Sequence, residues 1–197
     1  PVWDVIKTLP GLYDSKPTSS TAAAASAYAA FTSRGLYKAF PEIRKALDLW
    51  QSTPEDSDLM SKLYKNEDIK LAALARTPFV GAANANTEQM ERLALTFDPK
   101  VIERTANTAI SRLEALQNAD GGFAWGDWTR YSSEWATSSV LSSLGRLNRL
   151  GYYPADNSRL DRIIDKAFTY IESRITGEES ASSYAYLYSL YPGRKAG

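Results

Sequence analysis

Three carboxylates that follow one another along the chain are the side chains best suited to acid–base chemistry. Asp120, Asp127 and Glu134 flank a glycine pair and a group of aromatic residues. Two carboxyl groups at the right separation can act as acid and base in glycoside hydrolysis. Asp120 is also typical of turns, and Glu134 falls in the first turn of an expected helix, where the helix dipole favours a carboxylate. We therefore interpret the three carboxylates as structural.

Four aromatic residues lie among these carboxylates: Trp125, Trp128, Tyr131 and Trp135. Aromatic rings gathered on a loop can stack on a sugar face or on a peptide side chain, and Trp128, Tyr131 and Trp135 are the candidates to face a ligand. The alternative is that the aromatic residues plug the end of a helical core. We favour the plug, because large aromatic side chains dominate core burial.

The sequence contains no cysteine and no histidine. These absences exclude a disulfide framework, a thiolate nucleophile, cysteine-based metal sites, the Ser-His-Asp triad and the histidine zinc helix. Catalysis by a serine and a lysine requires the two side chains to meet in space. The Ser-Lys pairs of this chain, at 15–16 and 61–62, are only neighbours in sequence. We expect a protein that is not an enzyme, with no catalytic residue, no cofactor and no metal.

Composition places the chain among ordinary globular domains. It has 197 residues, 44% of them hydrophobic, with 23 basic and 23 acidic side chains, so no net charge attracts nucleic acid. No apolar run approaches the length of a membrane span, so we expect no membrane insertion by this segment. Because the chain begins at Pro1 without a methionine, we expect residues 1–197 to form a single α-helical domain of a larger multidomain chain.

Apolar residues recur at helical spacing through most of the sequence, and no stretch alternates as a strand does. An all-α fold follows, built from antiparallel helical hairpins because the loops are short. A short opening segment, 2–9, precedes loops at 9–11 and 15–20. The expected helices cover about 21–38, 41–50, 59–64, 69–74, 87–97, 99–116, 132–150, 158–177 and 181–191, with further loops at 52–57 and 77–86.

The most distinctive string is a corner between two helices at 116–125. Its glycines permit positive φ, its aspartate can bond nearby backbone amides, and its aromatic pair is expected to fold back onto the hairpin. The residues that define it are Gln117, Asp120, Gly121, Gly122, Phe123 and Trp125. The string resembles the corner of α/α-toroid proteins, namely the terpenoid cyclases and the thioester domains of the alpha-2-macroglobulin and complement family.

An ordered set of strings extends the resemblance over nearly the whole chain. Together they are similar to the thioester-domain region of bacterial alpha-2-macroglobulin-like proteins. The strings lie at 9–12, 41–50, 63–66, 77–79, 87–98 and 116–125. The resemblance implies an α/α toroid, partial at this chain length, within a large extracytoplasmic protein that is periplasmic or anchored at the cell surface. Its implied partners are neighbouring β-sandwich domains of the parent chain and the proteases that the parent traps.

The chain departs from that family at the reactive site. Thioester-bearing members have a cysteine two residues before a Glu-Gln pair. In this sequence Ser19 stands at the cysteine position, and Thr21 and Ala22 stand where the pair would be. A hydroxyl cannot form the thioester, so the resemblance implies a non-catalytic domain that acts by steric entrapment within the parent.

Two other functions stay open at this point. One is a glycan-acting or prenyl-processing α/α-toroid enzyme, for which Asp120, Asp127 and Glu134 are the acid and base candidates. The other is a carbohydrate- or peptide-binding helical module that uses Trp125, Trp128 and Trp135. The enzyme needs convergent carboxylates in a deep polar pocket, and the binding module needs exposed tryptophans.

Overall fold

The computed structural model describes residues 2–14, 16–45, 87–175 and 178–194. These residues form α-helices and no β-strand, which confirms the all-α prediction. The helices are α1 (Val2–Leu12), α2 (Ser20–Ala39), α7 (Thr87–Phe97), α8 (Pro99–Leu116), α9 (Glu134–Leu150), α10 (Ser158–Glu172) and α11 (Glu178–Ser189). The helices expected at 59–64 and 69–74, the loop at 77–86, most of the helix expected at 41–50 and the 61–62 pair lie outside the described residues.

The helices begin and end where their capping residues dictate. The Ser19 side chain accepts the amide of Ala22 at the start of α2, and Ser133 does the same for α9. Asp98 caps α8 ahead of a proline at its first position. At the far end of α9, Gly151 adopts the left-handed conformation with φ of 70°. These boundaries agree with those expected from the sequence.

Two boundaries differ from expectation. The loop predicted at 9–11 is wrong, since α1 continues through Pro10 to Leu12. Its burial explains the extension, because Ile6 and Leu9 lie in a core whose packing outweighs the local cost of the proline. The helix α10 ends at Glu172 instead of near 177, because the Ser173 hydroxyl bonds the carbonyl of Tyr170 and competes with the helical pattern.

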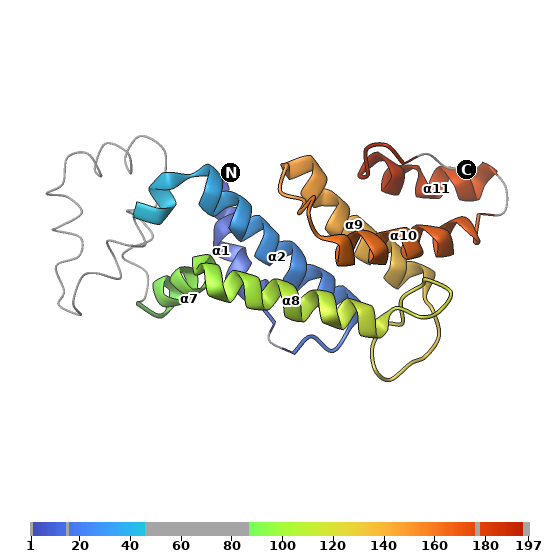
Figure 1. Ribbon diagram of the computed structural model, residues 1–197, viewed down its shortest axis with the longest axis horizontal. Coiled ribbons are helices and arrows are strands. Elements are labelled where there is room, and N and C mark those ends of the chain that lie inside the picture. The colour runs from blue at the N-terminus through green and yellow to red at the C-terminus, as the bar shows by residue number, and fades with distance from the viewer. Residues whose placement is uncertain (1, 15, 46–86, 176–177, 195–197) are drawn as a thin grey trace, which may run out of the picture.

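The arrangement centres on α2, which lies antiparallel to α8 (Figure 1). Five alanines of α2 are fully buried, so the neighbouring backbones can approach closely. The helices α9 and α10 also run in opposite directions and complete the main core with α11 (Figure 1). The buried alanines of this core in α2 are Ala23, Ala24, Ala27 and Ala30.

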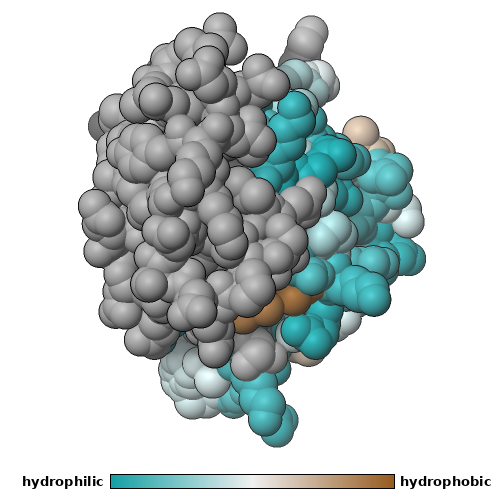
Figure 2. Space-filling view, turned by 90° about the vertical axis from the view of Figure 1, so that its left-hand side faces the viewer, coloured by the Kyte–Doolittle hydropathy of each residue, from teal (hydrophilic) through white to brown (hydrophobic). Residues whose placement is uncertain are grey.

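A second, smaller core joins α1, the C-terminal half of α2 and α7. It contains Leu9, Leu36 and Phe97, and it is tied by the Tyr13 hydroxyl, which donates to the carbonyl of Thr96 at 2.8 Å. Burial raises the pKa of Tyr13 to about 12, so this hydroxyl remains a donor at neutral pH. At this end of the molecule the described surface is mainly hydrophilic, with a small apolar area (Figure 2).

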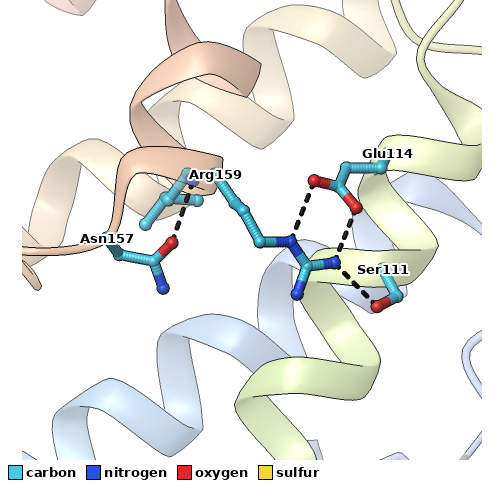
Figure 3. A network of polar contacts seen from close by, with 5 residues as sticks. Ser111, Glu114, Asn157 and Arg159 are labelled. Carbon is cyan, nitrogen blue, oxygen red and sulfur yellow. Dashed lines mark hydrogen bonds and ion pairs between the residues drawn. The ribbon is translucent and has the colours of Figure 1, made fainter.

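A bidentate ion pair joins α10 to α8 (Figure 3). The Arg159 guanidinium donates to both oxygens of Glu114, at 3.0 and 2.6 Å, and also to the Ser111 hydroxyl at 2.9 Å. The hydrogen bond from Arg159 lowers the pKa of Glu114. Both side chains are partly exposed, so the pair orients α10 while contributing little stability.

The close packing around α2 predicts the effect of enlarging one of its alanines. We expect Ala27→Leu to lower the free energy of unfolding by about 1–3 kcal/mol, because the fully buried site has no room for the added carbons. The matched control is Ala115→Leu on the exposed face of α8, which should change stability little, since both residues favour helices. Urea denaturation followed by circular dichroism measures both, and equal midpoints would contradict the packing argument.

Candidate functional site

The corner between α8 and α9, residues 117–126, contacts four helices. Gln117 ends α8, and its side-chain amide donates to the carbonyl of Gly121 at 3.0 Å and to the carbonyl of Ile163 in α10 at 2.8 Å. The amide of Ala124 returns to the carbonyl of Leu116. A single glutamine therefore ties the loop both to itself and to the neighbouring helix.

The glycine pair has two different structural roles. Gly121 has φ of 88°, and a Cβ there would lie 2.1 Å from the carbonyl oxygen of Lys166. Gly122 does not have a positive φ; a side chain there would collide with Ser132 and Tyr170. The conformational role expected of both glycines thus applies to Gly121, whereas Gly122 is required by close approach.

Asp120 holds the turn, as its position predicts. Its Oδ1 accepts the amide of Gly122 at 3.0 Å and the hydroxyl of Ser132 at 2.6 Å. The side-chain amide of Asn118 donates to the same hydroxyl at 2.9 Å. These bonds join the two ends of the long loop that leads into α9.

Phe123 is the buried anchor of the corner. Its side chain is fully buried, its amide donates to the hydroxyl of Thr137 at 2.9 Å, and its carbonyl accepts the amide of Ser133 at 2.8 Å. Two residues later the carbonyl of Trp125 accepts the amide of Ser20 at 3.0 Å. The corner is thereby fixed to the N-terminal ends of both α9 and α2.

The expectation that the aromatic group plugs the core is wrong. Trp125, Trp128, Tyr131 and Trp135 are 39%, 69%, 86% and 58% exposed. Phe123 already fills the buried position at this end of the hairpin, which leaves the other rings at the surface. Trp125 and Trp135 stack on each other with centroids 4.5 Å apart and planes 7° from parallel. The tryptophans are thus exposed, as a binding surface requires.

The three candidate carboxylates are engaged with three different groups. Asp120 holds the turn, Asp127 pairs with Arg112, and Glu134 accepts the hydroxyl of Tyr184 in α11. In the contacts described, no two of these carboxylates share a side-chain partner. Across the described ranges, no three side chains of the types that bind metal ions are grouped closely enough to hold one.

The segment at the expected thioester position has a capping role. The Ser19 hydroxyl accepts the amide of Ala22 at 3.1 Å and lies 3.2 Å from the Thr21 hydroxyl. Arg112 of α8 donates to the carbonyl of Pro17 at 2.8 Å, beside its pair with Asp127. This segment therefore lies directly against the corner, although the two are far apart in sequence.

A groove of about 350 Å³ between α9 and α11 was not foreseen from the sequence. It is open to solvent and starts at Trp135, the ring that stacks on Trp125. Its lining is formed by Trp135, Ser138, Ser139, Ser142, Ser143, Arg146, Tyr184, Tyr186 and Leu187. The serines recur at helical spacing on one side of α9, which is the only signal of the groove in the sequence.

Comparison with known proteins returns no matching protein-family model, no matching curated protein and no matching solved structure. Among the helices that the structure describes, none is both long and apolar enough to cross a membrane.

The corner predicts a large difference between two glycine substitutions. Gly121→Ala should lower the free energy of unfolding by about 3 kcal/mol, because a side chain at positive φ also meets the Lys166 carbonyl. Gly151→Ala is the control: its φ is similar but its surroundings are open, so we expect a loss of about 1 kcal/mol. Chemical denaturation of both variants tests this, and equal losses would show that the contact with Lys166 is unimportant.

Proposed function

We propose that the chain is the thioester-less helical domain of a bacterial alpha-2-macroglobulin-like protease inhibitor. It is non-catalytic, and it acts within its parent protein by helping to enclose an attacking protease. The observation that carries the proposal is the contact between the family-like corner and the segment at the expected thioester position. The amide of Ser20, beside the expected thioester position, donates to the carbonyl of Trp125 in the corner at 3.0 Å.

The chemistry of residues 19–22 supports the thioester-less form. An internal thioester needs a cysteine thiol and a glutamine carboxamide. Ser19 stands at the position of the cysteine and Ala22 at that of the glutamine, so both groups are missing there. The Ser19 hydroxyl is engaged as the N-cap of α2. A protease held by the parent would therefore be retained by enclosure and not by acylation.

The remaining parts of the proposal follow from the resemblance. Residues 1–197 form one domain. Its helices make up at least part of an α/α toroid. The toroid packs against β-sandwich domains of the parent chain and moves when a bait segment elsewhere is cleaved. The parent is extracytoplasmic, either periplasmic or anchored at the cell surface, and proteases are its targets.

The glycan- or prenyl-processing enzyme is a weaker candidate. It needs two carboxylates that converge in one pocket. Asp120, Asp127 and Glu134 instead bind Ser132, Arg112 and Tyr184 respectively, and none of the three lines the groove between α9 and α11.

The test is a trapping assay on the full-length parent. We expect a broad-specificity protease, once incubated with the parent, to lose cleavage of a large protein substrate while it keeps cleavage of a small peptide. We also expect the protease to be released by denaturation, because no acyl bond can form. The parent carrying Ser19→Cys is the matched variant: it should also form no covalent adduct, since Ala22 provides no carboxamide.

Two results would contradict the proposal. Equal cleavage of large and small substrates would show that the parent encloses no protease. A protease adduct that survives denaturation would show that the parent acts by covalent chemistry that residues 19–22 cannot supply.

A further inference from the structure

We propose that the groove between α9 and α11 binds an acidic oligosaccharide, with the Trp135 ring stacked on a sugar face and Arg146 paired with the acidic group. This inference rests on the groove alone and is independent of the protease-trap proposal.

One face of α9 forms the floor of the groove. The lining positions 135, 138, 139, 142, 143 and 146 follow the helical spacing of three and four residues. At 1.5 Å per residue they extend about 16 Å along the helix. Four of these residues are serines, whose hydroxyls both donate and accept hydrogen bonds. The floor is therefore long, shallow and rich in groups that pair with sugar hydroxyls.

Aromatic rings stand at both ends of this floor. Trp135 is 58% exposed and is backed by Trp125, which stacks against it and holds its orientation. Tyr186 of α11 is 45% exposed and also lines the groove. An exposed ring that is already held in place offers an apolar face at little entropic cost, which suits stacking by the C–H face of a sugar.

Among the described residues that line the groove, the charged one is Arg146. Arg146 hydrogen-bonds the Tyr186 hydroxyl and lowers the pKa of that tyrosine, while the Arg149 guanidinium lies 5.4 Å from the centre of the same ring. Among the side chains that the structure describes, leaving aside those of 176–183, no carboxylate forms an ion pair with either arginine. The Glu134 carboxylate accepts the hydroxyl of Tyr184 but does not itself line the groove. The acidic group of a ligand therefore belongs at the Arg146 end.

The lining argues for a saccharide over a peptide or a helix. A protein partner is usually anchored by apolar side chains that fill desolvated pockets. Among the described residues that line this groove, one is aliphatic, Leu187, and four are serines. A partner with hydroxyls along its length and a negative charge at one end matches these groups more closely.

The test measures binding of defined probes to the 197-residue chain by isothermal titration calorimetry, with tryptophan fluorescence as a second readout. The probes are an oligogalacturonate, a heparin-derived oligosaccharide and a neutral maltooligosaccharide of equal length, with a poly-glutamate peptide as the charge control. We expect an acidic oligosaccharide to bind at least about tenfold more tightly than the neutral one and than poly-glutamate. The two acidic probes distinguish recognition of a carboxylate from recognition of a sulfate.

Variants locate the binding. Arg146→Gln should weaken binding of the acidic oligosaccharide about tenfold, and Trp135→Ala should weaken binding of both acidic and neutral saccharides. Arg104→Gln on the exposed face of α8 is the matched control: it removes the same charge outside the groove and should leave affinity unchanged. Circular dichroism verifies that each variant is folded.

Three results would overturn the proposal. Absence of binding by both acidic oligosaccharides would exclude the ligand class. Equal binding of poly-glutamate would show that the groove recognises charge or a peptide. Equal losses for Arg146→Gln and Arg104→Gln would show that binding occurs elsewhere or through net charge.

Discussion

The fold depends on the hydrogen-bond partners that the backbone amides and carbonyls of the corner at 117–126 find. A loop that enters a core must find a partner for each buried amide and carbonyl, because an unpaired one costs about 1–3 kcal/mol. Here the partners come from four helices: Ser20 of α2, Leu116 of α8, Thr137 of α9 and, through the Gln117 side chain, Ile163 of α10. The same bonds that make the loop acceptable inside the protein also fix the relative positions of these helices. Burial of Phe123 makes the arrangement cooperative, since its ring cannot enter the core unless its amide and carbonyl are paired.

Much of the helical framework is predictable because its signals are local. Asp98 before Pro99, Ser133 before α9 and Gly151 after it determine boundaries by their own side chains or by their φ angles. The same is true of Asp120, which bonds an amide two residues away. The prediction failed where the decisive partner is distant in sequence. Leu9 keeps α1 helical past Pro10 by packing against α2 and α7, and Tyr170 of α10 is a neighbour that leaves no room for a side chain at Gly122. Neither neighbour can be identified from local patterns.

In the candidate site, too, local features were predictable and contacts between distant residues were not. Residue types correctly suggest a corner with a held aspartate, but they do not say which aromatic ring takes the single buried place. Phe123 takes it, and the tryptophans are left at the surface, where Trp125 and Trp135 stack. The groove could not be predicted because one of its walls comes from α11. The serines of α9 have the spacing of an ordinary solvated helical face until Tyr186 and Leu187 are placed opposite them. The toroid and the macroglobulin family, which rest on resemblance, stay predictions.

The alanine-rich α2 has a further consequence for how the fold forms. An alanine loses no side-chain rotamer freedom when it is buried, whereas leucine and isoleucine lose about 0.5–1 kcal/mol each. The alanine positions of this helix therefore add almost no side-chain entropy cost to folding. That cost falls on the longer side chains of the helices around it, such as Leu113, Leu144 and Ile163.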